Sequence, residues 1–204
     1  MNGGEFSLNY GQRESSYDFL VGALPAGATW GRQDSRDVSD GATTTISGWK
    51  GLSFGDTGFV TIAAEWKDQD RTERGGWDVR PQYPLLAGGV FDPREATFDR
   101  FNNWYGEPEM EQSTIFVNAG NTLANGVKLY GWASYQLREA RSAGFYRRAN
   151  DDRNTIQIYP DGFLPIIAPE VDDLSAAGGA TWNWGEWAMD SSLVYGKNKM
   201  AFTI

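Results

Sequence analysis

Apolar and polar residues alternate with a period of two along several long stretches of the chain. The clearest stretch is 127–137, and residues 6–10 and 60–66 follow the same pattern. Successive side chains of a β-strand point to opposite faces of the sheet, so this period is typical of strands rather than helices. The pattern predicts an all-β chain with seven strands, at residues 4–14, 41–53, 58–68, 112–122, 126–138, 173–184 and 186–198.

The predicted connections alternate between short and long. Short turns fall at residues 55–58, 124–126 and 185–186, and long loops at about 15–40, 69–111 and 139–172. The predicted strands are longer than the ~5–6 residues usual in globular sheets. They match the ~9–11 residues with which a tilted strand crosses a bilayer. Outer-membrane barrels combine short periplasmic turns with long extracellular loops. We therefore predict an antiparallel up-and-down segment of a transmembrane β-barrel in the outer membrane of a Gram-negative bacterium.

Composition excludes several other classes of function. The net charge is −9, which disfavours a nucleic-acid partner because phosphates need a basic face. Cysteine and histidine are both absent, so we expect no thiol or imidazole chemistry, no metal site, no cofactor and no enzyme activity. No run approaches the ~18 apolar residues of a membrane helix. Met1 is not followed by a signal peptide, and we expect a longer parent protein.

Large aromatic residues gather next to the predicted short turns. Outer-membrane barrels carry girdles of aromatic side chains at both membrane interfaces. The same residues could instead fill the core of a soluble β-sheet protein, but the strand lengths favour a girdle. The candidate girdle consists of Phe54, Phe59, Trp182, Trp184 and Trp187.

Three segments resemble receptor sequences from Gram-negative bacteria. Residues 142–148 with 159–165 are similar to an extracellular-loop region of TonB-dependent receptors, and residues 92–100 and 127–136 are similar to the same family. The resemblance extends over most of the chain. It implies that residues 1–204 are a partial barrel domain, contributing about seven strands to a 22-stranded barrel.

The same resemblance implies a role in transport. TonB-dependent receptors import a scarce ligand, such as a ferric siderophore or another nutrient, through a barrel closed by a plug domain. It implies that the partners are this small molecule, outer-membrane lipid and the TonB complex, which acts through a plug outside this chain. No plug sequence or TonB box is found in residues 1–204.

The third long loop carries the candidate ligand-binding residues. Guanidinium groups suit anionic ligands, and aromatic rings stack on them or on the ligand. The alternative is that the arginines in and beside this loop pair with Asp151, Asp152 and Asp161 and only hold the loop together. These arginines are Arg138, Arg141, Arg147, Arg148 and Arg153. The candidates are Arg147, Arg148, Tyr146 and Phe163.

Two acidic groups allow other hypotheses. Asp34, Asp37 and Asp40 could bind Ca²⁺, although a solvated acidic loop fits their spacing better. A carboxylate pair for glycoside hydrolysis could come from residues 92–99, but nothing in the sequence places two carboxylates across a cleft. The charged and amide residues expected to face the barrel lumen are Glu65, Lys67, Lys128 and Gln136.

A soluble β-rich binding or adhesion module is the main alternative to a transporter segment. It accounts for the alternation and for the aromatic residues. It does not account for long strands joined by connections that alternate in length. A carbohydrate-active enzyme is a third hypothesis, which the absence of histidine and cysteine disfavours.

Overall fold

The computed structural model describes residues 2–204 and contains seven long strands. A single turn of 3-10 helix, Pro93–Ala96, lies in the second long loop. The described residues include no helix long and apolar enough to cross a membrane. The strands are β1 (Gly3–Asp18), β2 (Ser35–Phe54), β3 (Gly58–Gln69), β4 (Glu109–Thr122), β5 (Lys128–Ala143), β6 (Ile166–Trp184) and β7 (Trp187–Thr203).

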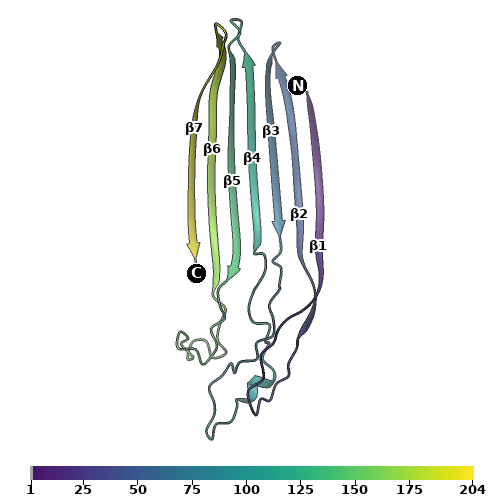
Figure 1. Cartoon of the computed structure of the whole chain (residues 1–204), viewed down its shortest axis with the longest axis vertical. Helices are drawn as coiled ribbons and strands as arrows, with labels where there is room; N and C mark the ends of the chain where they lie inside the picture. Colours follow the sequence, from purple (N-terminus) through teal and green to yellow (C-terminus); the bar gives the residue numbers. More distant parts are fainter. Residues whose placement is uncertain (1) are drawn as a thin grey trace.

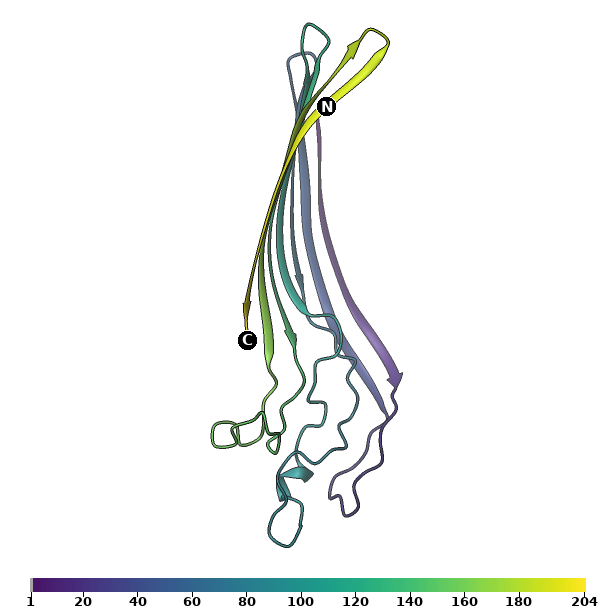
Figure 2. The same cartoon turned by 60° about the vertical axis from the view of Figure 1, so that its left-hand side comes forward.

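The strands form one antiparallel sheet in sequence order, so each strand pairs with its neighbour in the chain (Figure 1). The three short turns lie at one end of the sheet. The three long loops, residues 19–34, 70–108 and 144–165, lie together at the other end (Figures 1 and 2). The predicted all-β, up-and-down arrangement is confirmed. The sheet is a single open layer with β1 and β7 at its edges.

The strands extend further toward the loops than the sequence predicted. β2 begins at Ser35 rather than at 41, and β6 begins at Ile166 rather than at 173. Backbone hydrogen bonds continue through these segments, because a ladder does not require hydrophobic alternation. A register shift between Gly11 and Arg13 precedes the extended part of the first hairpin. The loops are therefore shorter than the predicted 15–40, 69–111 and 139–172.

The register of the six strand pairs separates the side chains into two faces. Directly paired residues share a face, as Leu8, Ile46 and Trp66 do across β1 to β3. Following the pairs across the sheet defines the apolar face, which carries most of the large apolar side chains. Its members include Phe6, Leu8, Ile46, Leu52, Val60, Ile62, Ile115, Val117, Leu129, Ala133, Tyr135, Leu137, Leu174, Ala176, Leu193 and Tyr195.

The opposite side of the sheet, which we call the polar face, is rich in Ser, Thr, Asn and charged residues. It carries the four residues that were expected to face a lumen, Glu65, Lys67, Lys128 and Gln136. Trp49 also lies there, because its neighbours in register are Glu5 and Ala63. This placement explains why Trp49 and Ile46 do not follow one apolar stripe along β2.

Most of the fully enclosed side chains lie among the loops rather than in the sheet. Glu95 and Arg100 have 0% exposure, and Trp30 and Tyr83 are buried. The Trp30 and Phe91 rings meet edge to face with their centroids 5.0 Å apart. The long loops therefore form a packed body of their own, which we call the loop layer.

Candidate functional site: an uncovered apolar face and an arginine-lined hollow

The apolar face of the sheet is uncovered. Phe6 is 72% exposed and Leu193 is 80% exposed, and Ile62, Ile115 and Leu137 are exposed as well. No other described element packs against the sheet (Figure 2). Scattered apolar residues on a surface are ordinary, but an apolar face that extends across seven strands, interrupted by Lys50 of β2, marks a surface that another apolar medium or partner covers.

Aromatic residues border the apolar face at its turn end. Phe54, Trp182, Trp184 and Trp187 share this face, and Trp184 pairs directly with Trp187. Phe59 does not belong to this group. It is paired with Gly120, and its ring covers that glycine on the polar face. Four of the five candidate girdle residues therefore lie beside the turns on the apolar face, whereas Phe59 lies on the polar face and follows the parity opposite to Val60.

The polar face has a shallow aromatic hollow that the sequence did not reveal. It encloses about 280 Å³ and is lined by Trp49 and Phe116 together with Glu5 and Glu65. The Trp49 ring nitrogen donates to the Glu5 carboxylate over 3.5 Å. Phe116 stacks with Trp132. The polar face therefore mixes charged groups with rings.

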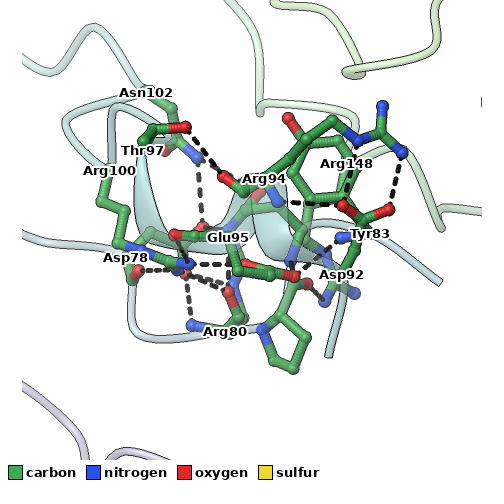
Figure 3. A network of polar contacts seen from close by, with 12 residues as sticks. Asp78, Arg80, Tyr83, Asp92, Arg94, Glu95, Thr97, Arg100, Asn102 and Arg148 are labelled. Carbon is green, nitrogen blue, oxygen red and sulfur yellow. Dashed lines mark hydrogen bonds and ion pairs between the residues drawn. The ribbon is translucent and has the colours of Figure 1, made fainter. Parts of the chain in front are cut away.

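A buried ion pair organises the loop layer (Figure 3). The Arg100 guanidinium donates to the Glu95 carboxylate over 2.5 Å, and both side chains are inaccessible to solvent. The other Glu95 oxygen accepts from the backbone N–H groups of Gln82 and Tyr83. Arg100 also donates to the carbonyl oxygens of Asp78 and Arg80. Most polar atoms of the pair are therefore hydrogen-bonded, as burial of an ion pair requires, whereas the Arg100 Nε is buried without a partner.

Further contacts join the three loops into one body. Arg100 lies 4.1 Å over the Trp30 ring of the first loop. The Tyr83 hydroxyl donates to Asp161 in the third loop over 3.0 Å. Arg94 reaches the same carboxylate, also over 3.0 Å. The relative positions of the loops are therefore fixed by polar contacts rather than by the sheet beneath them.

A hollow of about 430 Å³ opens between the second and third loops, and four arginines lie on its wall. Arg147 and Arg148 come from the third loop, whereas Arg80 comes from the second. We call it the arginine hollow. Its lining consists of Arg80, Asn103, Tyr105, Phe145, Tyr146, Arg147, Arg148, Asp151 and Arg153.

Three of the four predicted ligand-binding residues meet in this hollow. Tyr146 lines it, but its hydroxyl already donates to the Asp161 carbonyl oxygen over 2.8 Å. Burial raises the pKa of Tyr146 to about 12, so the hydroxyl stays protonated. Phe163 does not line the hollow. It pairs with Arg147 through the backbone, and its ring packs on Tyr159 with the centroids 4.6 Å apart, so its contacts lie within the third loop.

The alternative interpretation of the arginines as loop-holding ion pairs holds for only one of them. Arg153 pairs with Asp151 over 2.9 Å, and this contact holds the pKa of Asp151 far below its ordinary value. Within residues 2–204, neither Arg147 nor Arg148 lies within ion-pair distance of a carboxylate. Arg148 instead donates to the Pro81 carbonyl oxygen over 2.9 Å.

Sequence reasoning missed Arg80, which reaches the hollow from a different loop. The Arg80 fork binds Asp78 through two contacts of 2.8 Å. Burial alone would raise the pKa of Asp78, but the hydrogen bonds from Arg80 outweigh it and lower the pKa to about 2. The Asp-x-Arg spacing in the sequence indicates the Asp78–Arg80 contact. No local sequence pattern indicates that Arg80 lies near Arg147.

Arginine side chains pair with several carboxylates of the two acidic groups described above. Asp40 binds Arg74 over 2.7 Å, and Asp92 caps the 3-10 turn and binds Arg94. Glu95 is sealed against Arg100. Among the described residues, no group of three or more acidic side chains is placed to hold a metal ion. Neither the proposed Ca²⁺ cluster nor the carboxylate pair is assembled.

Comparisons with known protein families, with curated proteins and with solved structures gave no match to this chain. Its function is therefore inferred from the apolar face, the polar face and the loop layer.

Proposed function

We propose that the seven strands are a stretch of the wall of an outer-membrane β-barrel, with the apolar face toward lipid and the polar face toward the lumen. The observation that carries this proposal is the slope of the apolar face. The boundary between its apolar and charged residues crosses the strands obliquely. In a soluble sheet, nothing would prevent this boundary from running perpendicular to the strands.

The slope follows from the register. On the apolar face, the first charged residue of β3 beyond the apolar stretch is Asp68, which aligns through successive pairs with Ala201 of β7. The first charged residue of β7 on this face is Lys197, four residues nearer the turn. The boundary lies level across β3, β4 and β5, at Asp68, Glu111 and Glu139. It then moves two residues toward the turn at Asp172 of β6 and two more at Lys197 of β7, so it averages one residue for each of the four strands crossed.

The turn end of the sheet moves in the same direction. Phe59 of β3 aligns with Ser192 of β7 through the same succession of pairs. β3 starts one residue before Phe59, whereas β7 starts at Trp187, five residues before Ser192. Both limits of the apolar face are therefore displaced by four residues over four strands.

This displacement matches the strand tilt of a membrane barrel. With a rise of ~3.3 Å per residue and ~4.8 Å between strands, one residue per strand corresponds to a tilt of about 35°. Transmembrane barrel strands tilt by ~35–45°. The stretch from Leu129 to Leu137 is roughly 26 Å long, or roughly 22 Å along the membrane normal, against a lipid-facing band of ~25 Å in known barrels.

The loop layer supports a receptor role. Long loops at one end of a barrel can fold over its mouth, and here they form a packed body with a hollow. Together with the resemblance to TonB-dependent receptors, this favours import of a scarce ligand, such as a ferric siderophore or another nutrient. Import would further need a plug domain and the TonB complex as partners.

A soluble binding or adhesion module accounts for the loop layer equally well. It would, however, leave the apolar face of seven strands in water. At ~25 cal/mol per Å² of apolar surface, such exposure is strongly unfavourable, so the membrane wall remains the better proposal.

Cysteine scanning tests the membrane wall, because the natural chain has no cysteine. Ala133→Cys and Ser134→Cys are neighbours in β5 on opposite faces. With the chain folded in detergent micelles, we expect A133C to resist a water-soluble maleimide and to react with a membrane-partitioning one. S134C should react with the water-soluble reagent. Equal reactivity of both positions toward the water-soluble reagent would contradict the proposal.

A further inference from the structure

We propose that the arginine hollow binds a small organic molecule bearing carboxylate or phosphate groups, and that such an oxyanion is the ligand class of the proposed receptor. The transport part of this statement rests on the proposed function. The binding part depends only on the geometry of the loop layer.

The charge balance of the hollow is the first argument. The chain as a whole carries a net charge of −9, yet four arginines and one aspartate line this space. Asp78 and Asp151 neutralise Arg80 and Arg153 through paired hydrogen bonds. The positive charges of Arg147 and Arg148 remain without a carboxylate. A partly enclosed positive charge without a partner is costly, and an anionic ligand would offset that cost.

The free donors are the second argument. A guanidinium carries five N–H groups. The Nη1 atom of Arg147 is buried without a hydrogen-bond partner. Arg148 uses Nη1 for the Pro81 carbonyl oxygen, and its side chain forms no other polar contact with residues 2–204. Both forks therefore keep donors for an oxyanion, whose geometry suits paired contacts with a guanidinium.

Size and ring content narrow the ligand class. A volume of about 430 Å³ falls within the ~300–1,000 Å³ typical of small-molecule sites. Phe145 is 66% exposed and Tyr105 is 48% exposed, and both residues line the same hollow. These surfaces suit a carbon skeleton beside the charged groups, so the geometry points to an organic polyanion rather than an isolated inorganic ion.

Citrate and pyrophosphate titrations of the full chain in neutral-detergent micelles test the site. We expect saturable binding of citrate that weakens with salt, and weaker binding of pyrophosphate, which lacks a carbon skeleton. Replacing both free arginines, R147Q with R148Q, should weaken citrate binding by at least about tenfold, because hydrogen bonds to charged groups contribute strongly. A matched control removes the same charge elsewhere, R32Q with R138Q, and should change binding by less than about twofold.

Two further experiments distinguish paired hydrogen bonds from charge alone, and a soluble ligand from a lipid headgroup. R147K with R148K retains the charge but loses the paired geometry, and we expect an intermediate loss. Vesicles containing anionic phosphate lipids should not displace citrate, since displacement would make a lipid headgroup the occupant. The proposal is overturned if citrate does not bind, or if R147Q with R148Q binds it as the natural chain does while circular dichroism is unchanged.

The test separates the two proposals. If the natural chain binds citrate but A133C and S134C react alike, the oxyanion site is supported and the membrane wall is refuted. If the two variants react oppositely and citrate does not bind, the membrane wall is supported and the oxyanion site is refuted.

Discussion

The sheet and the loop layer of this protein bury opposite kinds of residue. In the sheet, large apolar side chains such as Phe6 and Leu193 lie exposed on one face. In the loop layer, the ionised side chains of Glu95 and Arg100 are sealed from solvent. A protein whose regular structure exposes its apolar residues while its loops enclose charges does not have the arrangement of an ordinary soluble domain.

The sheet and the loop layer are therefore stabilised by different interactions. The loop layer closes its own polar network and packs the Trp30 and Phe91 rings inside it. The sheet has hydrogen bonds between its strands but gains little from burial while its apolar face is uncovered. A change of solvent should therefore act on the sheet, and a change of a single buried charge should act on the loops.

The largest expected effect comes from breaking the buried ion pair. Glu95→Gln leaves the Arg100 charge enclosed without a carboxylate, which typically costs ~3–5 kcal/mol. We expect the loop layer to open while the strands remain. Limited proteolysis should cut residues 70–108 in the variant and spare them in the natural chain, with little change in the far-ultraviolet circular dichroism.

The matched control for this prediction is Arg141→Ala. Arg141 forms an exposed ion pair with Glu109 over 2.9 Å at the base of the loops. Exposed pairs of this kind contribute ~1 kcal/mol or less. Equal protease sensitivity of the two variants would mean that the buried pair does not hold the loop layer together.

The second expected effect concerns the two faces of β5. Ala133→Arg puts a charge in the middle of the apolar face, between Val117 and Ala176. At the midplane of a bilayer, an arginine on the lipid side of a barrel costs ~2–4 kcal/mol. We expect this loss in the free energy of unfolding, measured by denaturant titration in micelles or vesicles.

Ser134→Arg places the same charge one residue further along β5, on the opposite face of the sheet. Ser134 lies on the polar face beside Ser175, where water has access in the proposed barrel. We expect a change of ~1 kcal/mol or less, the usual effect of a substitution at a solvated position. Similar losses in both variants would indicate that both faces are covered by protein, as in a soluble sandwich.

The sequence predicted the sheet well because alternation is a local signal. Seven strands, their order and their turns follow from the spacing of residues such as Val60, Ile62 and Ala64. The same alternation also indicates the face of Phe59. Because Phe59 is adjacent to Val60 in β3, its side chain points to the opposite face. The extended strand ends carry no alternation, so only the backbone ladder reveals them.

The loop layer could not be predicted to the same degree, because its contacts join residues from different loops. The Arg147 and Arg148 candidates followed from residue type. The contribution of Arg80 to the same hollow depends on how residues 70–108 fold around Glu95, which no local pattern encodes. Long-range placement of polar groups is thus the part of this site that requires the structure.

The smallest expected effect is a pH dependence confined to the loop layer. The carboxylate of Asp78 accepts from Arg80, Gln82 and Asn102, and its pKa is lowered to about 2. In an unfolded chain an aspartate titrates near ~3.9. The resulting stabilisation, on the order of 2 kcal/mol, is fully present above about pH 4 and is lost as the pH falls toward about 2.

Asp78→Asn isolates this contribution. The difference in loop-layer stability between the natural chain and the variant should be constant at neutral pH and should shrink between about pH 4 and pH 2. Fluorescence of the buried Trp30 environment during denaturant titration, followed at several pH values, measures it. Asp56→Asn, in the exposed turn between β2 and β3, should behave as the natural chain does at every pH. A difference for Asp78→Asn that persists unchanged to pH 2 would mean that the Asp78–Arg80 fork does not stabilise the loops through its charge.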